Sequence, residues 1–168
     1  NGRLESDINE LTKLISSMLQ VSHTNVELIK DSEYYSLVDT FGFLSKHKEN
    51  SLACQFMLDN ALDKFIVEDI KIDNPCLFDT SEVRFYAGFL LYNTDREAVA
   101  ILNIIDPEPR KLSETQIAQV QLIAEQISRR LEDRRKAITL EELRNELVYK
   151  NTQLKNFAGV VSHDMKMP

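Results

Sequence analysis

Arg84–Tyr92, with the sequence RFYAGFLLY, is the stretch that decides the fold of this 168-residue chain. Its aromatic and branched residues favour a β-strand, in which successive side chains point to opposite faces of the sheet. One face carries Phe85, Ala87, Phe89 and Leu91, and the other carries Tyr86, Leu90 and Tyr92. Because neither face is plainly polar, the strand is predicted to lie in a sheet that is covered on both sides.

The segment that follows predicts a second central strand. Asn93–Glu97 has the polar composition of a turn, and Ala98–Ile105 (AVAILNII) is apolar on both faces except at Asn103. Pro107 and Pro109 then end the strand, because proline cannot donate a ladder hydrogen bond. The two strands predict an α/β (α+β) sandwich, with helices on one face of the sheet and a different cover on the other.

Shorter patterns predict the elements that precede residue 84. Apolar residues at helical spacing indicate an amphipathic helix over 3–20, namely Leu4, Ile8, Leu11, Ile15 and Met18. Strands over 25–30 and 34–41 flank a polar turn and predict a hairpin. A short helix over 52–58, a strand over 65–69 and a loop over 70–80, which contains Pro75, complete this region.

A long helix is predicted from residue 114 onward, with Ser113 as N-cap and Gln116 as its capping-box partner. Its apolar positions become heptads at Leu140, Leu143, Leu147, Leu154, Phe157 and Val161, while Lys136 and Lys150 interrupt the repeat. About 50 helical residues span about 75 Å and need an apolar partner. A parallel homodimeric coiled coil through this helix is the expected arrangement, and a helix folded back on its own domain is the alternative. The two lysines weaken the coil and are expected to tune it.

Composition excludes several functional classes. The formal charge of −7 disfavours a nucleic-acid partner, and no run of residues has the length and apolarity of a membrane span. The three histidines, His23, His47 and His163, are too far apart in sequence to indicate a metal site. Cys54 and Cys76 are expected to be reduced, structural thiols of a cytoplasmic protein. Because the chain does not begin with Met, we expect it to be part of a longer protein, whose possible membrane anchor this sequence leaves open.

The last twelve residues, Phe157–Pro168 (FAGVVSHDMKMP), carry the clearest chemical motif. A solvent-facing histidine can attack a γ-phosphoryl group through its neutral nitrogen, and an adjacent carboxylate can accept the other ring proton. This segment resembles the phosphoacceptor box of sensor histidine kinases. The resemblance implies that His163 is the phosphoacceptor, that Asp164 is the general base, and that Pro168 bends the helix just beyond them.

The kinase resemblance also implies partners and cofactors. The parent protein would use ATP and Mg²⁺ and would transfer phosphate to a response-regulator receiver domain. The chain itself has no glycine-rich nucleotide-binding region, so it should hold no cofactor and be inactive alone. Met167 stands where the family usually has Asn or Thr, which implies weak phosphatase activity, because methionine cannot position water in the same way.

Residues 3–133 resemble a GAF domain. The resemblance rests mainly on Val83–Phe89 (VRFYAGF), Ile105–Arg110 (IDPEPR) and Leu112–Gln116 (LSETQ). It implies an antiparallel sheet with helices on both sides and a small-molecule pocket under the loops between Gly42 and Thr80. Cys54 lacks the following histidine usual in bilin-binding relatives, so the effector and its binding residues stay unidentified. Arg84 and Tyr86 could face this pocket, but an ion pair and a buried aromatic residue are the favoured interpretations.

The two resemblances and the heptad pattern together imply three regions: a GAF domain over 1–133, a coiled-coil signalling helix over 134–156, and the truncated start of a DHp (HisKA) phosphoacceptor helix over 157–168. The predicted function is the sensory and dimerising region of a two-component histidine kinase. Two alternatives stay open. One is a non-catalytic GAF–coiled-coil interaction module, and the other is a thiol-redox GAF enzyme that uses Cys54 and Cys76.

Overall fold

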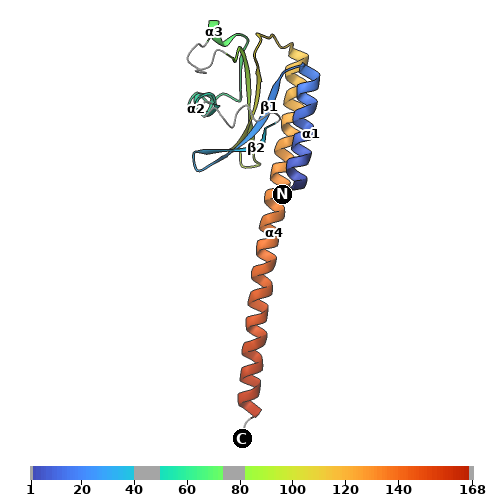
Figure 1. Ribbon diagram of the computed structural model, residues 1–168. Helices are drawn as coiled ribbons and strands as arrows, with labels where there is room; N and C mark the ends of the chain where they lie inside the picture. The colour runs from blue at the N-terminus through green and yellow to red at the C-terminus, as the bar shows by residue number, and fades with distance from the viewer. Residues whose placement is uncertain (1, 40–49, 74–81, 167–168) are drawn as a thin grey trace. The chain divides into compact units, whose positions relative to one another are not determined.

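The computed structural model describes residues 2–39, 50–73 and 82–166 (Figure 1). Within them an antiparallel sheet has the strand order β2-β1-β5-β4-β3. Its strands are β1 (His23–Lys30), β2 (Glu33–Asp39), β3 (Lys64–Val67), β4 (Phe85–Tyr92) and β5 (Ala98–Asp106). The two strands that were predicted to be central, β4 and β5, pair with each other, and β5 lies in the middle of the sheet.

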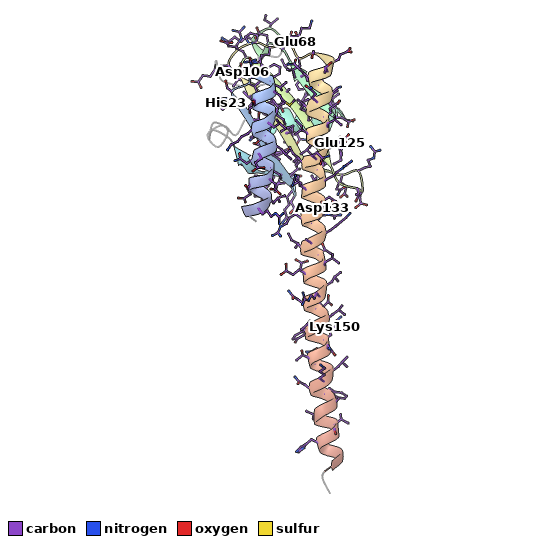
Figure 2. All side chains as sticks on the ribbon, turned by 90° about the vertical axis from the view of Figure 1, so that its right-hand side faces the viewer. His23, Glu68, Asp106, Glu125, Asp133 and Lys150 are labelled. Atoms are coloured by element: carbon purple, nitrogen blue, oxygen red, sulfur yellow. The ribbon has the colours of Figure 1, made fainter. Side chains whose placement is uncertain are left out.

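Two helices cover one face of the sheet. These are α1 (Gly2–Leu19) and the first part of α4 (Glu114–Lys166), which lie side by side in Figure 2. Their buried residues pack on the alternate β4 side chains that were predicted for this face, namely Phe85, Ala87, Phe89 and Leu91. The helix residues of this core include Ile8 and Ile15 from α1 and Val120, Ala124 and Ile127 from α4. The period-two pattern of β4 and the helical spacing of α1 therefore identified the main core correctly.

The opposite face of the sheet is covered by α2 (Asn50–Asp59). Buried residues of α2, Ala53, Cys54 and Met57, pack on two smaller clusters that include Tyr86, Leu90, Ile101 and Ile105. The antiparallel sheet with helices on both sides confirms the predicted α+β fold class. We call this second surface the α2 face.

One short segment corrects the sequence prediction. Residues 70–80 were expected to form a loop, but α3 (Ile70–Asp73) is a helical turn. The Asp69 carboxylate accepts a hydrogen bond from the Lys71 amide at 3.2 Å, which caps the turn, and the Ile70 side chain is buried. The rest of the expected loop lies outside the described residues.

A buried carboxylate fixes the start of α4 relative to α1. Asp106, at the end of β5, accepts hydrogen bonds from the amide and hydroxyl of Ser22 at 2.8 and 2.9 Å and from the Glu108 amide at 3.1 Å. It also pairs with Arg110, whose guanidinium donates to the Leu19 carbonyl at 3.2 Å. Burial alone would raise the pKa of Asp106, but these hydrogen bonds outweigh burial and lower the pKa.

The long helix is continuous from Glu114 to Lys166, a span of 53 residues. The predicted capping box is present, since the Ser113 hydroxyl accepts from the Gln116 amide at 3.1 Å and Gln116 accepts from the Ser113 amide at 2.9 Å. The chain divides into two compact units, Asn1–Glu132 and Asp133–Pro168, and α4 contributes to both. No helix in the described part of the chain is long and apolar enough to cross a membrane.

Candidate functional site

His163 lies in the last turns of α4, and its imidazole is exposed to solvent. An exposed ring on a regular helix can approach a phosphoryl donor without any rearrangement of its own backbone. Asp164 belongs to the same helix, but its side chain lies outside the described residues, as do Met167 and Pro168. The proposed bend at Pro168 is therefore an expectation from sequence alone.

The helix before His163 carries an apolar row that is exposed to solvent. We call Lys136, Leu140, Leu143, Leu147, Lys150, Leu154, Phe157 and Val161 the heptad seam. Every residue from 135 to 160 is exposed, and the leucines of the seam are about two-thirds exposed or, for Leu143, half exposed. Lys150 forms an ion pair with Glu146 at 2.9 Å, one helical turn earlier. An apolar row of this length is typical of a helix that binds a partner.

A second candidate site is a buried row of polar side chains on the α2 face. The Tyr86 hydroxyl donates to Asn103 Oδ1 at 2.7 Å, Asn103 Nδ2 donates to Asn25 Oδ1 at 2.9 Å, and Asn25 Nδ2 lies 3.4 Å from Glu27 Oε1. The row crosses β4, β5 and β1, and all four side chains are buried. Buried polar groups that satisfy one another rigidify the surface they occupy. We call these four residues the polar row.

The polar row depends on a glycine. Gly88 pairs with Asn103 across the sheet, and the Tyr86 ring lies over the position that a Cβ at residue 88 would occupy. Such a Cβ would collide with the Tyr86 hydroxyl and lie 2.9 Å from Met57 Sδ. Gly88 thus allows Tyr86 to reach Asn103.

We expect Gly88→Ala to lower the free energy of unfolding by about 1–3 kcal/mol, because the tyrosine and Met57 must both move in a packed core. Gly159→Ala is the matched control, since nothing lies within 4 Å of its added Cβ. That change removes a helical glycine and should raise stability by about 0.5–1 kcal/mol if it has any effect. Urea denaturation monitored by circular dichroism measures both changes, and a neutral Gly88→Ala variant would contradict the packing argument.

Arg84 forms an ion pair and Tyr86 is a buried aromatic residue, as the sequence favoured. Arg84 forms an ion pair with Asp69, to which both its Nε and its Nη2 donate, and it is only partly exposed. The hydrogen bond from Arg84 lowers the pKa of Asp69. Tyr86 is fully buried, and burial raises the pKa of its hydroxyl well above the usual value.

Cys54 is buried on the α2 face beside Tyr34. Burial raises the pKa of its thiol to about 11, the hydrogen bond with Tyr34 opposes this shift, and the negative charge of Glu27 adds to it. A thiol with this pKa is protonated at neutral pH and is a poor nucleophile. This observation disfavours a redox role for Cys54, while Cys76 lies outside the described residues.

Alkylation tests the state of Cys54. We expect iodoacetamide to label Cys54 of the folded chain at least 100-fold more slowly than that of the urea-unfolded chain at pH 8, because a buried, protonated thiol is both inaccessible and unreactive. The rate in the folded chain should keep rising up to about pH 11, the pKa of the thiol. Mass spectrometry of the Cys54 peptide gives both rates, and a rate that levels off near pH 7 would indicate an activated thiolate instead.

A groove of about 780 Å³ lies on the other side of the sheet, between the end of β4 and α4. Its lining combines the strand residues Phe89–Tyr92 with Asp63, Asn93, Arg96, Gln121, Ala124, Glu125, Ser128 and Arg129. Oppositely charged side chains share its rim, so the lining indicates no single ligand charge. In the part of the chain that is described, no group of three or more His, Cys, Asp or Glu residues could hold a metal ion.

No protein-family model and no curated protein matches this sequence. Solved structures do match the fold. The third GAF domain of Slr1393 from Synechocystis sp. PCC6803 aligns with a TM-score of 0.67 at 12% identity, over 82% of this chain and 98% of its own.

The chain has the GAF fold.

Two further GAF-fold structures differ in activity. A domain of a protein assigned to the two-component sensor histidine kinases, from Sinorhizobium meliloti 1021, aligns with a TM-score of 0.55 at 12% identity, over 87% of this chain and 97% of its own. The type II free methionine-R-sulfoxide reductase from Thermoplasma acidophilum aligns with a TM-score of 0.65 at 12% identity, over 79% of this chain and 94% of its own. A domain from a protein assigned to the sensor histidine kinases and a methionine sulfoxide reductase therefore share this fold, and the fold alone assigns neither activity.

Proposed function

We propose that this chain is the sensory and signal-transmitting region of a cytoplasmic two-component histidine kinase, and that His163 accepts the phosphoryl group. The observation that carries the proposal is the exposed imidazole of His163, set in a phosphoacceptor-like sequence on a continuous helix. The GAF fold of the first unit, and its likeness to a domain from a protein assigned to the sensor kinases, support a sensory role.

The proposed chemistry is a phosphoryl transfer from ATP, whose Mg²⁺ complex a separate domain of the kinase would bind. The unprotonated ring nitrogen of His163 attacks the γ-phosphorus, the bond to the β,γ-bridging oxygen breaks, and ADP leaves. The ring then carries a proton on its other nitrogen, which Asp164 accepts as general base. A receiver-domain aspartate of a response regulator would next take the phosphoryl group from His163.

The proposed signal path begins on the α2 face, where a small-molecule effector would act on the polar row. The chain would dimerise through the heptad seam of α4. The packing of α1 against residues 114–131 would set the helix geometry that presents His163. Lys136 and Lys150 would keep two packings of the seam close in free energy. Unchanged signal response after both lysines are replaced by leucine in the kinase would refute this tuning.

The experiment that tests the proposal uses the intact gene product that contains these 168 residues. Incubation with γ-labelled ATP and Mg²⁺ should place label on the protein, and acid should remove that label while alkali should preserve it, because phosphohistidine is acid-labile. A protein that gains no label is a GAF–coiled-coil interaction module. A protein whose label survives acid is phosphorylated on another residue type. Either result excludes the proposed role of His163.

Met167 gives a further prediction about the reverse reaction. Because methionine offers no hydrogen bond to a hydrolytic water, the kinase should remove phosphate from its response regulator slowly in the absence of ATP. Met167→Asn should increase that rate by about 10²-fold, the lower end of the range that one positioned acid–base group contributes. The measurement is the loss of label from a phosphorylated receiver domain, and rapid loss with the unaltered protein would contradict the prediction.

A further inference from the structure

The hairpin that joins β4 to β5 makes a polar contact with α4 at the last buried residue of that helix in the described part of the chain. The Thr94 hydroxyl donates to Glu132 Oε1 at 3.2 Å. Glu132 is 8% exposed, although glutamate is rarely buried, and residues 135–160 that follow are all exposed. A second polar contact joins the same part of α4 to α1, where Arg130 forms an ion pair with Asp7 at 2.9 Å.

The hairpin is built to hold Thr94 in place. Asn93 is buried, and its Oδ1 accepts hydrogen bonds from the amides of Asp95 and Glu97, both at 2.9 Å. Its Nδ2 donates to Glu97 Oε2 at 3.0 Å, and Arg96 completes the turn in the left-handed region with a φ of 64°. The five-residue connection, Asn93–Glu97, is therefore organised by hydrogen bonds among its own residues.

A groove separates the hairpin from an earlier part of α4. The groove described above is lined by Asn93 and Arg96 from the hairpin and by α4 residues from Gln121 to Arg129. Beyond that groove, the hydrogen bond from Thr94 to Glu132 joins the two elements. A contact that follows an open groove can break without disturbing the core, because the core residues of α4 end at Ile127 and Leu131.

We propose that the β4–β5 hairpin is a latch that holds α4 at Glu132, and that its release frees the turn of α4 around residues 130–136. The strands of the hairpin also carry Tyr86 and Asn103, so a change in the polar row reaches the latch through continuous backbone. The use of the latch in signalling rests on the proposed function, whereas the latch itself is a property of this chain.

Hydrogen exchange on this 168-residue chain tests the latch. Thr94→Val should increase amide exchange over residues 130–136 by about 10-fold, since hydrogen bonds to charged groups contribute about that factor or more. Thr94→Ser keeps the hydroxyl and should restore exchange to within about twofold of the parent. Thr152→Val removes a similar hydroxyl, which donates to the Val148 carbonyl at 2.9 Å, and should leave residues 130–136 unchanged.

A double mutant locates the partner of Thr94. Glu132→Ala should itself increase exchange over residues 130–136, and adding Thr94→Val should change it no further, because both substitutions remove the same contact. Unchanged exchange in Thr94→Val overturns the latch, and so does an equal increase in β1 and β5, which would mean general destabilisation. Because no readout involves ATP, failure of the latch is distinguishable from failure of the kinase proposal.

Discussion

Replacing His163 with Gln is expected to abolish the acid-labile phosphate of the intact protein. Glutamine has a similar size and polarity and keeps the exposed helix end intact. Its amide nitrogen cannot attack phosphorus, however, because its lone pair is delocalised into the carbonyl group. The loss should be complete within detection, at least 100-fold, because the substitution removes the bond-forming atom and not a supporting contact. Labelling with γ-labelled ATP, followed by acid and alkali treatment, measures it.

The matched control for this substitution is His23→Gln. His23 begins β1 and is partly buried within the GAF unit, so its replacement tests the loss of a histidine as such. Labelling should persist in His23→Gln. Asp164→Asn separates the two proposed roles, because it keeps the nucleophile and removes the base, and it should slow labelling by about 10²-fold or more without abolishing it. Equal labelling of His163→Gln and the parent would remove the foundation of the proposed function.

The sequence predicted those parts of the fold that depend on local periodicity. The alternation in Phe85–Tyr92 separated the two core faces, and the spacing of Ile8 and Ile15 identified the buried side of α1. Ser113 and Gln116 form a capping box because both halves of that motif lie within one turn. Each of these inferences uses residues that are neighbours in the chain, so no knowledge of the tertiary structure was needed.

The contacts that escaped prediction join residues far apart in sequence. Ser22 meets Asp106 across 84 positions, and Thr94 meets Glu132 across 38. Asn103 did give a signal, as the one polar residue of an apolar strand, but its partners Asn25 and Tyr86 depend on strand register. The turn at α3 was missed because its cap, Asp69, was assigned to the strand predicted over 65–69, whereas β3 ends at Val67.

The phosphoacceptor assignment, unlike the fold, depends on a single short motif at the end of α4. The motif around His163 is local, and α4 presents the imidazole to solvent, as the chemistry requires. The side chain of Asp164 lies outside the described residues, and its role as base was predicted from its place beside His163.

Leu147→Lys is expected to convert a dimer of this chain into monomers. Leu147 lies on the heptad seam, where a dimer would bury it in both copies, and each buried leucine contributes about 1.5–3 kcal/mol. Placing two lysines in that layer should raise the dissociation constant by at least about 100-fold. Sedimentation velocity at micromolar concentration should then show a species of 19.4 kDa, where the parent shows one of twice that mass.

The neighbouring residue, Val148, supplies the control, because it and Leu147 are similarly exposed in a single copy of the chain. Val148 is 58% exposed and Leu147 is 68% exposed, so a solitary helix would tolerate lysine equally well at either position. One residue further along the helix is a rotation of 100°, which takes Val148 off the seam, and Val148→Lys should leave the dimer intact. Lys150→Leu should act in the opposite direction and tighten the dimer, because it replaces a charged residue on the seam whose partner, Glu146, belongs to the same helix. If Leu147→Lys and Val148→Lys behaved alike, the exposed apolar residues of α4 would not form a coiled-coil seam, and α4 would have to transmit any signal to His163 by another route.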